Sequence, residues 1–316
     1  MPWQFPTSID PASFAALAPE FILYARVELG MSVQTAAKYE ECLKQVWLCW
    51  GEQTMTVYTS ADLMRLKERM LNKKHSVSRQ STILLALKRF LRFCKEQKKM
   101  AVMDPEQIVA PRRPRREVLF LTPEEVQRFV SSIDLSTCRG EPRLSGLRLR
   151  ALAEMLLGSA MRIGELLSLD RDSINWKTRE AKIIGKGNKE RTVFFTDRAL
   201  KWLSRYLEVR IDDQPALFVC LNGRVRLKRE DLGRYFKKQG IVAELKKRVT
   251  PHILRHTAAT QLLFNGCPIG HIKEILGHER LETTCRYYLG LDHRAAKSAH
   301  NKFLVYEDQG SAVNAG

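Results

Sequence analysis

The sequence of 316 residues lacks the patterns that mark membrane and secreted proteins. No apolar run approaches the roughly 18 residues that a membrane-spanning helix needs. The first residues, Met-Pro-Trp-Gln-Phe-Pro, do not have the charged-then-apolar layout of a signal peptide. We therefore expect a cytoplasmic protein with no membrane partner.

Patterns for metal and nucleotide chemistry are also missing. The seven cysteines are odd in number and contain no Cys-x-x-Cys pair, which fits core packing in a reducing compartment better than a disulfide or zinc framework. Residues 185–189, Gly-Lys-Gly-Asn-Lys, lack the spacing of a phosphate-binding P-loop. His252 and His256 resemble a zinc pair, but Ile253 stands where a zincin has glutamate. We expect no cofactor and no metal.

Negative charge is scarce. The chain has 53 Lys and Arg against 35 Asp and Glu, a formal net charge of +18. An excess spread along the whole chain indicates a polyanionic partner, above all nucleic acid. The alternatives are a merely basic protein or a membrane-surface binder, and no basic amphipathic helix with lipid-anchor features stands out.

The first part of the chain, residues 1–110, is predicted to be a helical bundle. Four apolar stripes of helical period lie between Phe14 and Gln97. Ser60 is the expected cap of the third helix, and Ser78 or Ser81 that of the fourth. Four short amphipathic helices in this length predict a compact bundle.

Basic residues gather at the end of this bundle and in the stretch that follows. Residues 111–120 contain two prolines and four arginines and predict a basic linker. A one-sided basic face and an arginine-rich linker favour contacts with a DNA backbone, although a solvated face or spacer is the usual meaning of such charges. The candidate DNA-binding residues are Lys88, Arg89, Arg92, Arg112, Arg113, Arg115 and Arg116.

A second domain, residues 121–316, is predicted to be mixed α+β. Thr122, Pro123 and Glu125 form a capping box with proline at the first helical position. An apolar helix follows over about 147–159, and Arg162 opens the next helix. Two β-branched runs flanking a Gly/Asn turn predict a hairpin over 183–195. Helices return afterwards, so we expect a mainly α protein of two domains with a small antiparallel sheet.

The helix that begins at Thr250 and Pro251 carries charge beside its apolar stripe. His252, Arg255 and His256 lie three and four residues apart, so they are expected to project from roughly one face. A cation and an imidazole beside a buried stripe are costly without partners. This helix is therefore the expected place for chemistry on an anion.

Each candidate alone also has an ordinary interpretation. Arg162 could form a surface ion pair with Glu165, and Lys186 could be a solvated turn residue. His278 and the neighbouring Tyr287 and Tyr288 could be packing residues. The order of these residues along the chain carries more information than any one of them.

The constellation resembles the tyrosine recombinase (phage integrase) superfamily, with Xer-type recombinases the most similar. The matching segments are Met161–Leu169, Ile184–Arg191, His252–Thr260, Leu276–His278 and Thr283–Tyr287. The resemblance covers the whole second domain, and the helical first domain with its basic linker fits the SAM-like core-binding domain of this family.

The resemblance implies that Tyr287 attacks a phosphodiester and forms a 3′-phosphotyrosyl intermediate, which conserves the bond energy without ATP. Guanidinium groups of Arg162 and Arg255 would stabilise the transition state. The resemblance further assigns Lys186 as general acid for the leaving 5′-oxygen, His252 as base and acid, and His278 as a phosphate ligand. We interpret Glu165 as orienting Arg162 or as a surface partner, and His256 as structural.

Two features qualify the match. Tyr287 and Tyr288 would point about 100° apart on a helix, and the family's nine-residue step from His278 selects Tyr287. Ser159-Ala160 stands where threonine-glycine is usual, which predicts altered turn geometry with activity retained.

The expected function is site-specific DNA recombination of Xer-like type at the nucleoid. Expected partners are double-stranded DNA, a homotetramer on paired sites joined by exchange of a C-terminal helix over about 293–303, and a second recombinase or accessory proteins. The alternatives are a mobile-element integrase or transposase with the same chemistry, and a DNA-binding relative without catalysis.

Overall fold

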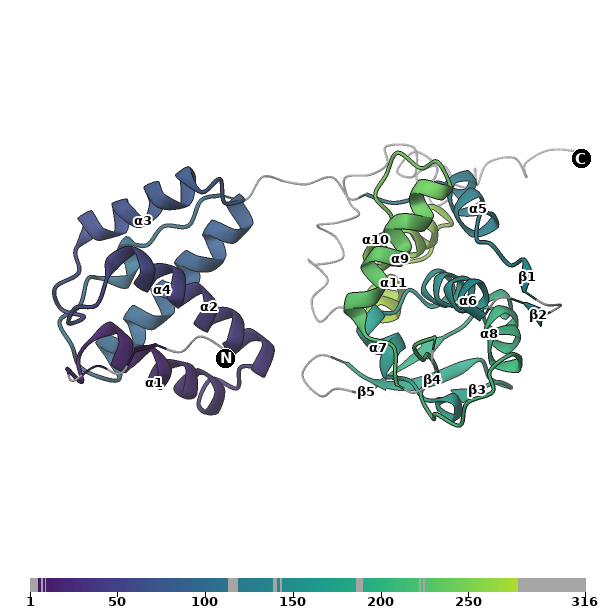
Figure 1. Cartoon of the computed structure of the whole chain (residues 1–316), viewed down its shortest axis with the longest axis horizontal. Coiled ribbons are helices and arrows are strands. Elements are labelled where there is room, and N and C mark those ends of the chain that lie inside the picture. Colours follow the sequence, from purple (N-terminus) through teal and green to yellow (C-terminus); the bar gives the residue numbers. More distant parts are fainter. Residues whose placement is uncertain are drawn as a thin grey trace, which may run out of the picture. The chain divides into compact units, whose positions relative to one another are not determined.

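The structure is a computed structural model of the chain. It describes residues 5, 6, 8, 10–112, 119–138, 141, 142, 144–185, 190–221, 223 and 225–277. The chain divides into two compact units, Met1–Arg116 and Glu117–Gly316 (Figure 1). Each unit has its own hydrophobic core. In the described part, no helix combines the length and apolar character needed to cross a membrane.

The N-terminal unit is the predicted bundle of four helices. They are α1 (Phe14–Val27), α2 (Val33–Trp50), α3 (Ser60–Asn72) and α4 (Val77–Glu96), followed by the short 3-10 helix η1 (Pro105–Gln107). The buried aromatic ring of Phe14 anchors the core, with edge-to-face contacts to Trp50, Tyr58 and Phe90 at centroid distances of 5.0 to 6.3 Å. Such contacts tie α1, α2 and α4 together and stabilise the unit beyond the burial of area alone.

The caps of α3 and α4 differ from the predicted ones. Thr59 caps α3 in a capping box with Asp62, and Ser60 is the first helical residue. Ser76 caps α4, and its side chain accepts a hydrogen bond from the amide of Arg79. Ser81 lies inside the helix and donates to the carbonyl of Val77 at 2.8 Å. Several neighbouring Ser and Thr residues are equally suitable as N-caps by local sequence. The caps predicted for α3 and α4 were therefore wrong.

The C-terminal unit is mixed α+β, as predicted. Its helices are α5 (Pro123–Ser131), α6 (Leu144–Ser159), α7 (Ile163–Ser168), α8 (Asp197–Glu208), α9 (Arg229–Val242), α10 (Pro251–Phe264) and α11 (Ile269–Leu276), with the short 3-10 helix η2 (Arg171–Ser173). The central helix α6 packs against α8 and α10 (Figure 1). It begins at Leu144, earlier than predicted, and buries Arg150 and Glu154 as an ion pair at 2.8 Å. The capping box of Thr122 and Glu125 is confirmed at the start of α5.

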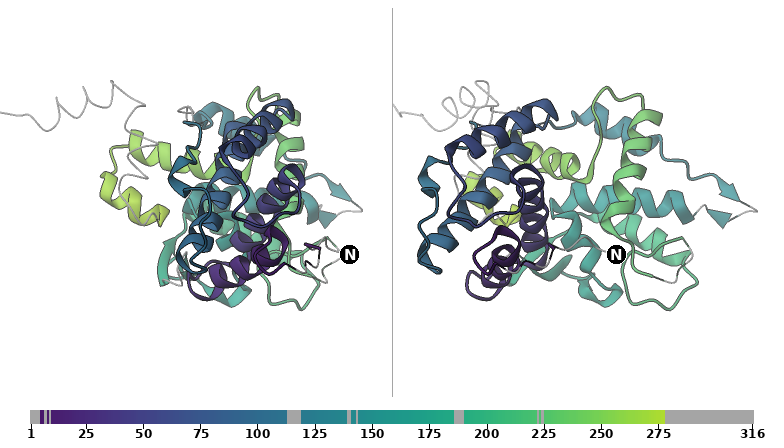
Figure 2. Two further views of the ribbon diagram at one scale, coloured as in Figure 1. Left: turned by 90° about the vertical axis from the view of Figure 1, so that its left-hand side faces the viewer. Right: turned by 60° about the vertical axis from the view of Figure 1, so that its left-hand side comes forward.

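A three-stranded antiparallel sheet completes this unit. The predicted hairpin is β4 (Glu180–Ile184) and β5 (Glu190–Phe194), and the unpredicted two-residue strand β3 (Ile174–Asn175) pairs with β4. Ala181 and Val193 are paired and buried, whereas Lys182 and Thr192 are paired and exposed. A separate pair, β1 (Thr137–Cys138) and β2 (Glu141–Pro142), extends away from the helices in both views of Figure 2.

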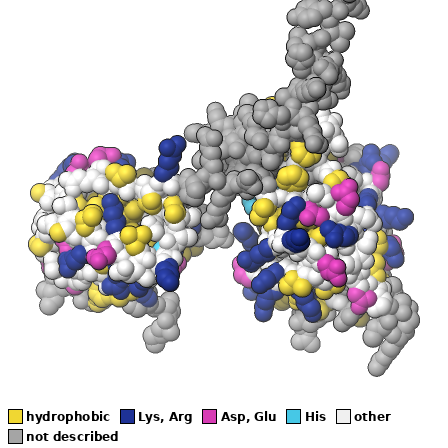
Figure 3. Space-filling view, turned by 90° about the horizontal axis from the view of Figure 1, so that it is seen from above, with side chains coloured by type: hydrophobic (Ala, Val, Ile, Leu, Met, Phe, Trp, Pro, Cys, Tyr) yellow, Lys and Arg dark blue, Asp and Glu magenta, His cyan; other side chains and the backbone are white. Residues whose placement is uncertain are grey.

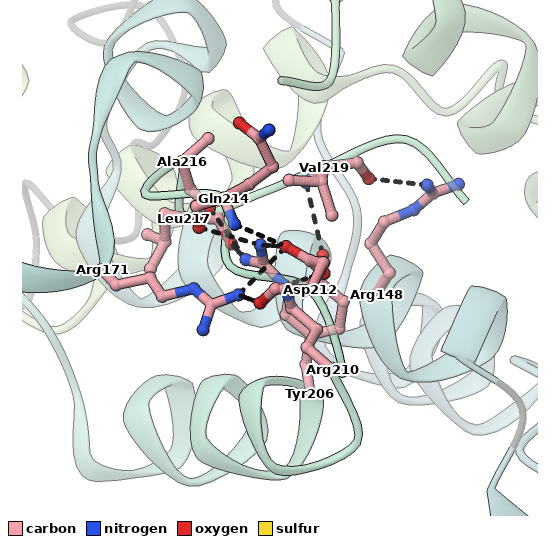
Figure 4. A network of polar contacts seen from close by, with 9 residues as sticks. All are labelled: Arg148, Arg171, Tyr206, Arg210, Asp212, Gln214, Ala216, Leu217 and Val219. Carbon is pink, nitrogen blue, oxygen red and sulfur yellow. Dashed lines mark hydrogen bonds and ion pairs between the residues drawn. The ribbon is translucent and has the colours of Figure 1, made fainter. Parts of the chain in front are cut away.

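A buried ion pair fixes the long connection between α8 and α9. The side chain of Arg210 is fully buried and donates to the carbonyls of Ala216 and Leu217 at 2.8 and 2.9 Å, and to Asp212 (Figure 4). Arg171 also donates to the Asp212 carbonyl at 2.6 Å. This irregular segment is therefore held by charge-assisted hydrogen bonds in place of a regular element.

Candidate active site

Arg162 lies at the start of α7 with its guanidinium anchored on one side. The backbone amide of Arg162 donates to Glu165 Oε2 at 2.7 Å, and Nη1 donates to Oε1 at 2.8 Å. Nη2 donates to the carbonyl of Gly277 at 3.1 Å. The side chain is still 40% exposed, so the guanidinium is oriented and remains accessible to an anion.

Arg255 comes from α10 and is much more enclosed, at 4% exposure. Its Nη2 donates to the carbonyl of Leu276, the last residue of α11. The sequence predicted that Arg255 would share a face with His252 and His256. The three residues differ in exposure: Arg255 is buried, His252 is exposed and His256 is half-buried. Arg255 is enclosed because its guanidinium lies against the end of α11, yet it is still close enough to His252 to influence its charge.

His252 and His256 contact each other at the start of α10. Their Nε2 atoms are 3.0 Å apart, and the rings meet edge to face. The pKa of His252 is lowered from its ordinary value, first by desolvation and then by the positive charges of Arg255, Arg229 and Arg162. The neutral imidazole is thus favoured at neutral pH, as a proton acceptor requires.

Glu165 is buried between two arginines. It bonds Arg162, as described, and Nη2 of Arg191 donates to its Oε2 at 2.9 Å. Burial is the largest single influence and raises the pKa of Glu165, but the Arg162 amide and the two guanidiniums together hold that pKa below its ordinary value. The carboxylate stays ionised and can orient both arginines.

Sequence reasoning missed Arg191. It lies in β5, opposite Ile183 of β4, on the sheet face that also carries the buried Val193. Strand alternation could have revealed it, since residues two apart share a face and an apolar residue such as Val193 favours the buried face. An arginine on the inner face of a strand needs partners, and Arg191 has them in Glu165 and the carbonyl of Ile275.

Three of the predicted catalytic residues lie outside the described part of the chain. Lys186 falls in the sequence between β4 and β5, His278 follows Gly277 directly, and Tyr287 comes nine residues later. The structure brings together Arg162, His252 and Arg255.

Three of the predicted DNA-binding residues have intramolecular partners. Lys88 and Arg92 both pair with Glu106 of η1, at 2.7 and 2.6 Å. The guanidinium of Arg89 lies over the ring of Tyr39, 5.6 Å from its centroid. Arg112 is exposed. Arg113, Arg115 and Arg116 lie outside the described residues.

Within the described residues, no group of three or more His, Cys, Asp or Glu side chains is arranged to hold a metal ion. His252 and His256 have each other at hydrogen-bond distance. Among the described residues, the site contributes the guanidinium groups of Arg162 and Arg255, and such groups bind phosphate oxygens bidentately.

The fold and these residues together define the class of a tyrosine recombinase. The family model described as "Phage integrase family" matches residues 119–294, more than half of the chain. The chain belongs to the phage integrase family, and the predicted superfamily and strand-transferase class are confirmed.

Individual relatives agree with this assignment. Tyrosine recombinase XerD of Staphylococcus haemolyticus is 28% identical over 294 residues, covering 90% of this chain and 97% of XerD. The structure of the XerH site-specific recombinase bound to a palindromic difH substrate has a TM-score of 0.71 at 19% identity, covering 91% of this chain and 84% of that one. The Tn1549 transposon integrase in complex with transposon right end DNA has a TM-score of 0.72 at 18% identity, covering 92% and 99%. The two structures confirm the fold class.

Proposed function

We propose that this recombinase cleaves and rejoins double-stranded DNA at a specific site through a 3′-phosphotyrosyl intermediate, with Tyr287 as the nucleophile. The observation that carries the proposal is the convergence of Arg162 and Arg255 on consecutive carbonyls, those of Gly277 and Leu276. Both guanidiniums are thereby fixed next to the point where the chain continues to His278. Two oriented arginines can stabilise the charge of a pentacoordinate phosphorus.

The reaction is a transfer of the phosphoryl group and needs no net water or redox partner. The hydroxyl oxygen of Tyr287 forms a bond to phosphorus, and the bond from phosphorus to the 5′-oxygen breaks. Lys186 gives the leaving oxygen a proton, while neutral His252 takes the proton of the tyrosine hydroxyl. Attack by a 5′-hydroxyl of a second strand reverses these steps and joins the new partner.

Nucleic-acid binding is supported by charge. The net charge is +18, and Lys and Arg side chains are frequent on the face of the C-terminal unit drawn in Figure 3. The proposal includes the division into domains. Residues 1–110 and 121–316 each bind DNA, and the linker 111–120 contacts the DNA phosphate backbone through Arg112, Arg113, Arg115 and Arg116.

Assembly and biological role are part of the same proposal. We place four copies on two paired sites, joined by the C-terminal segment over about 293–303, at the nucleoid. The similarity to XerD over nearly its full length favours Xer-like resolution over a mobile-element role. A transposition assay and a dimer-resolution assay with the same DNA site would separate the two.

The test uses a suicide substrate nicked near the cleavage point. Wild type and Tyr288→Phe should form a covalent protein–DNA adduct, with or without EDTA, and Tyr287→Phe should form none while binding DNA with unchanged affinity. An adduct with Tyr287→Phe and none with Tyr288→Phe would move the nucleophile to Tyr288. A strict need for magnesium would contradict the arginine mechanism. A wild type that binds the DNA but forms no adduct would favour the non-catalytic relative.

A further inference from the structure

The C-terminal end of α11 is held by three arginines from three different elements. The carbonyl of Ile275 accepts from Arg191 Nη1 at 2.8 Å, and the carbonyl of Leu276 accepts from Arg255. The carbonyl of Gly277 accepts from Arg162 Nη2 at 3.1 Å. The final carbonyls of a helix have no intrahelical partner and carry the negative end of the macrodipole, so cations are well placed here.

Of these three arginines, Arg191 alone has no part in the proposed chemistry. Its side chain is 16% exposed, and both of its terminal nitrogens have partners: Nη1 the Ile275 carbonyl, Nη2 Glu165. Glu165 in turn receives the amide and Nη1 of Arg162. A continuous path of hydrogen bonds therefore runs from α11 through Arg191 and Glu165 to Arg162.

The packing around Arg191 leaves it little freedom. Gly277 has φ +58, and a Cβ built on it would come within 2.6 Å of Arg191 Nε and 2.9 Å of Cζ. The guanidinium thus lies directly against the backbone of Gly277. A lysine could reach Glu165 or the carbonyl, but its single ammonium lacks the rigid fork that spans two acceptors.

We propose that Arg191 is a positioning residue for strand cleavage: it fixes Glu165, and through it the guanidinium of Arg162, relative to the C-terminal end of α11. This rests on the proposed function, because the reaction it serves is attack on a scissile phosphate held by Arg162. Without the forked guanidinium of Arg191, Arg162 can move relative to Arg255, and both are proposed to bind the same phosphate. Small displacements of this kind slow reactions strongly.

The experiment compares Arg191→Lys with a matched control, Arg226→Lys. Arg226 uses its guanidinium in the same way, donating to the carbonyls of Leu167 and Leu169 at 2.8 Å each and to Asp170. Both variants are expected to unfold at somewhat lower temperature. At saturating suicide substrate, Arg191→Lys should form the covalent adduct roughly 10- to 100-fold more slowly than wild type, with unchanged Kd for DNA. Arg226→Lys should react at the wild-type rate.

A double-mutant cycle tests the path through Glu165. If Arg191 acts through that carboxylate, Arg191→Lys combined with Glu165→Gln should be no slower than the slower single variant. Effects that multiply would overturn the path. A wild-type adduct rate in folded Arg191→Lys would overturn the positioning role itself.

An activity-independent readout separates this inference from the proposed function. The Arg162 backbone amide donates to Glu165, so its hydrogen exchange reports on the position of that carboxylate. Exchange should be faster in Arg191→Lys and unchanged in Arg226→Lys. If the wild type forms no adduct, the proposed function fails, and the exchange rates still decide the inference: equal rates in Arg191→Lys and wild type overturn it.

Discussion

At the scale of single residues, His252 determines how the site responds to pH. Its pKa lies below the ordinary value of 6.5, first because of desolvation and then because of nearby arginines. If neutral His252 accepts the proton of Tyr287, the rate of adduct formation should rise with pH through an apparent pKa below 6.5 and then level off. Single-turnover rates from pH 5 to 8 measure this, and His252→Gln should abolish the inflection.

The same shift has a consequence for stability. The pKa of this histidine is lower in the folded protein than in the unfolded chain. Its contribution to stability is therefore complete at a pH above the unfolded-state pKa, and it is lost as the pH falls through the folded-state pKa. Between about pH 6.5 and 5, wild type should therefore lose more thermal stability than His252→Gln. Parallel pH dependence in the two proteins would show that this histidine is not the group responsible.

Ala160 is strained in the backbone just before Arg162. It has φ +53 and is 2% exposed, in the left-handed region that disfavours a Cβ. Ala160→Gly should raise the free energy of unfolding by about 0.5–1 kcal/mol, after allowing for the greater freedom of glycine in the unfolded chain. Ala153→Gly, at a buried position inside α6, should lower it, and chemical denaturation compares the two.

At the scale of elements, the ends of α10 and α11 offer a matched pair of glycines. Gly266 has φ +79 and nothing within 4 Å of a built Cβ, whereas a Cβ on Gly277 would overlap Arg191. Both substitutions by alanine incur left-handed strain of about 1–2 kcal/mol. Gly277→Ala should lose more stability than Gly266→Ala and should also slow adduct formation. Equal effects on both quantities would argue against the contact with Arg191.

The α8–α9 connection depends on one buried ion pair. Asp212→Ala leaves the guanidinium of Arg210 buried without its carboxylate, which should cost roughly 3–5 kcal/mol of stability. The exposed neighbour provides the control, since Asp213→Ala should change the free energy of unfolding by less than about 0.5 kcal/mol. Urea denaturation of both variants measures the difference.

At the scale of the whole molecule, the positive charge should appear as salt-dependent DNA binding. Lys88 and Arg92 share Glu106, so a phosphate must compete with that carboxylate. Lys88→Ala should reduce the slope of log affinity against log salt by roughly one, whereas Glu106→Gln should strengthen binding. Arg65→Ala on α3, paired with Asp62, serves as the control and should leave the slope unchanged.

Local signals in the sequence predicted most of the fold. The capping box at Thr122, the hairpin of β4 and β5, and the helix that begins at Pro251 each depend on residues a few positions apart, and all three are confirmed. Ser76 and Thr59 were missed because neighbouring hydroxyl residues compete for the cap. The two-residue strand β3 is too short to have a period.

The arrangement of the site could be predicted only in part. Residue types and their order selected Arg162, His252 and Arg255, which the structure brings together. The contact from Arg162 to Gly277 joins residues 115 apart, and the contact from Arg191 to Ile275 joins residues 84 apart. No local pattern encodes such distances. Strand alternation could place Arg191 on the inner face of β5, but its partners, and the meeting of three arginines at the C-terminal end of α11, did not follow from the sequence.

The most direct test of the proposed chemistry is to locate the DNA on the protein. Wild type is trapped on the suicide substrate and digested, and the nucleotide-bearing peptide that contains both Tyr287 and Tyr288 is fragmented in a mass spectrometer. We predict a 3′-phosphate ester on Tyr287. A nucleotide on Tyr288, on any other residue, or on none would contradict it.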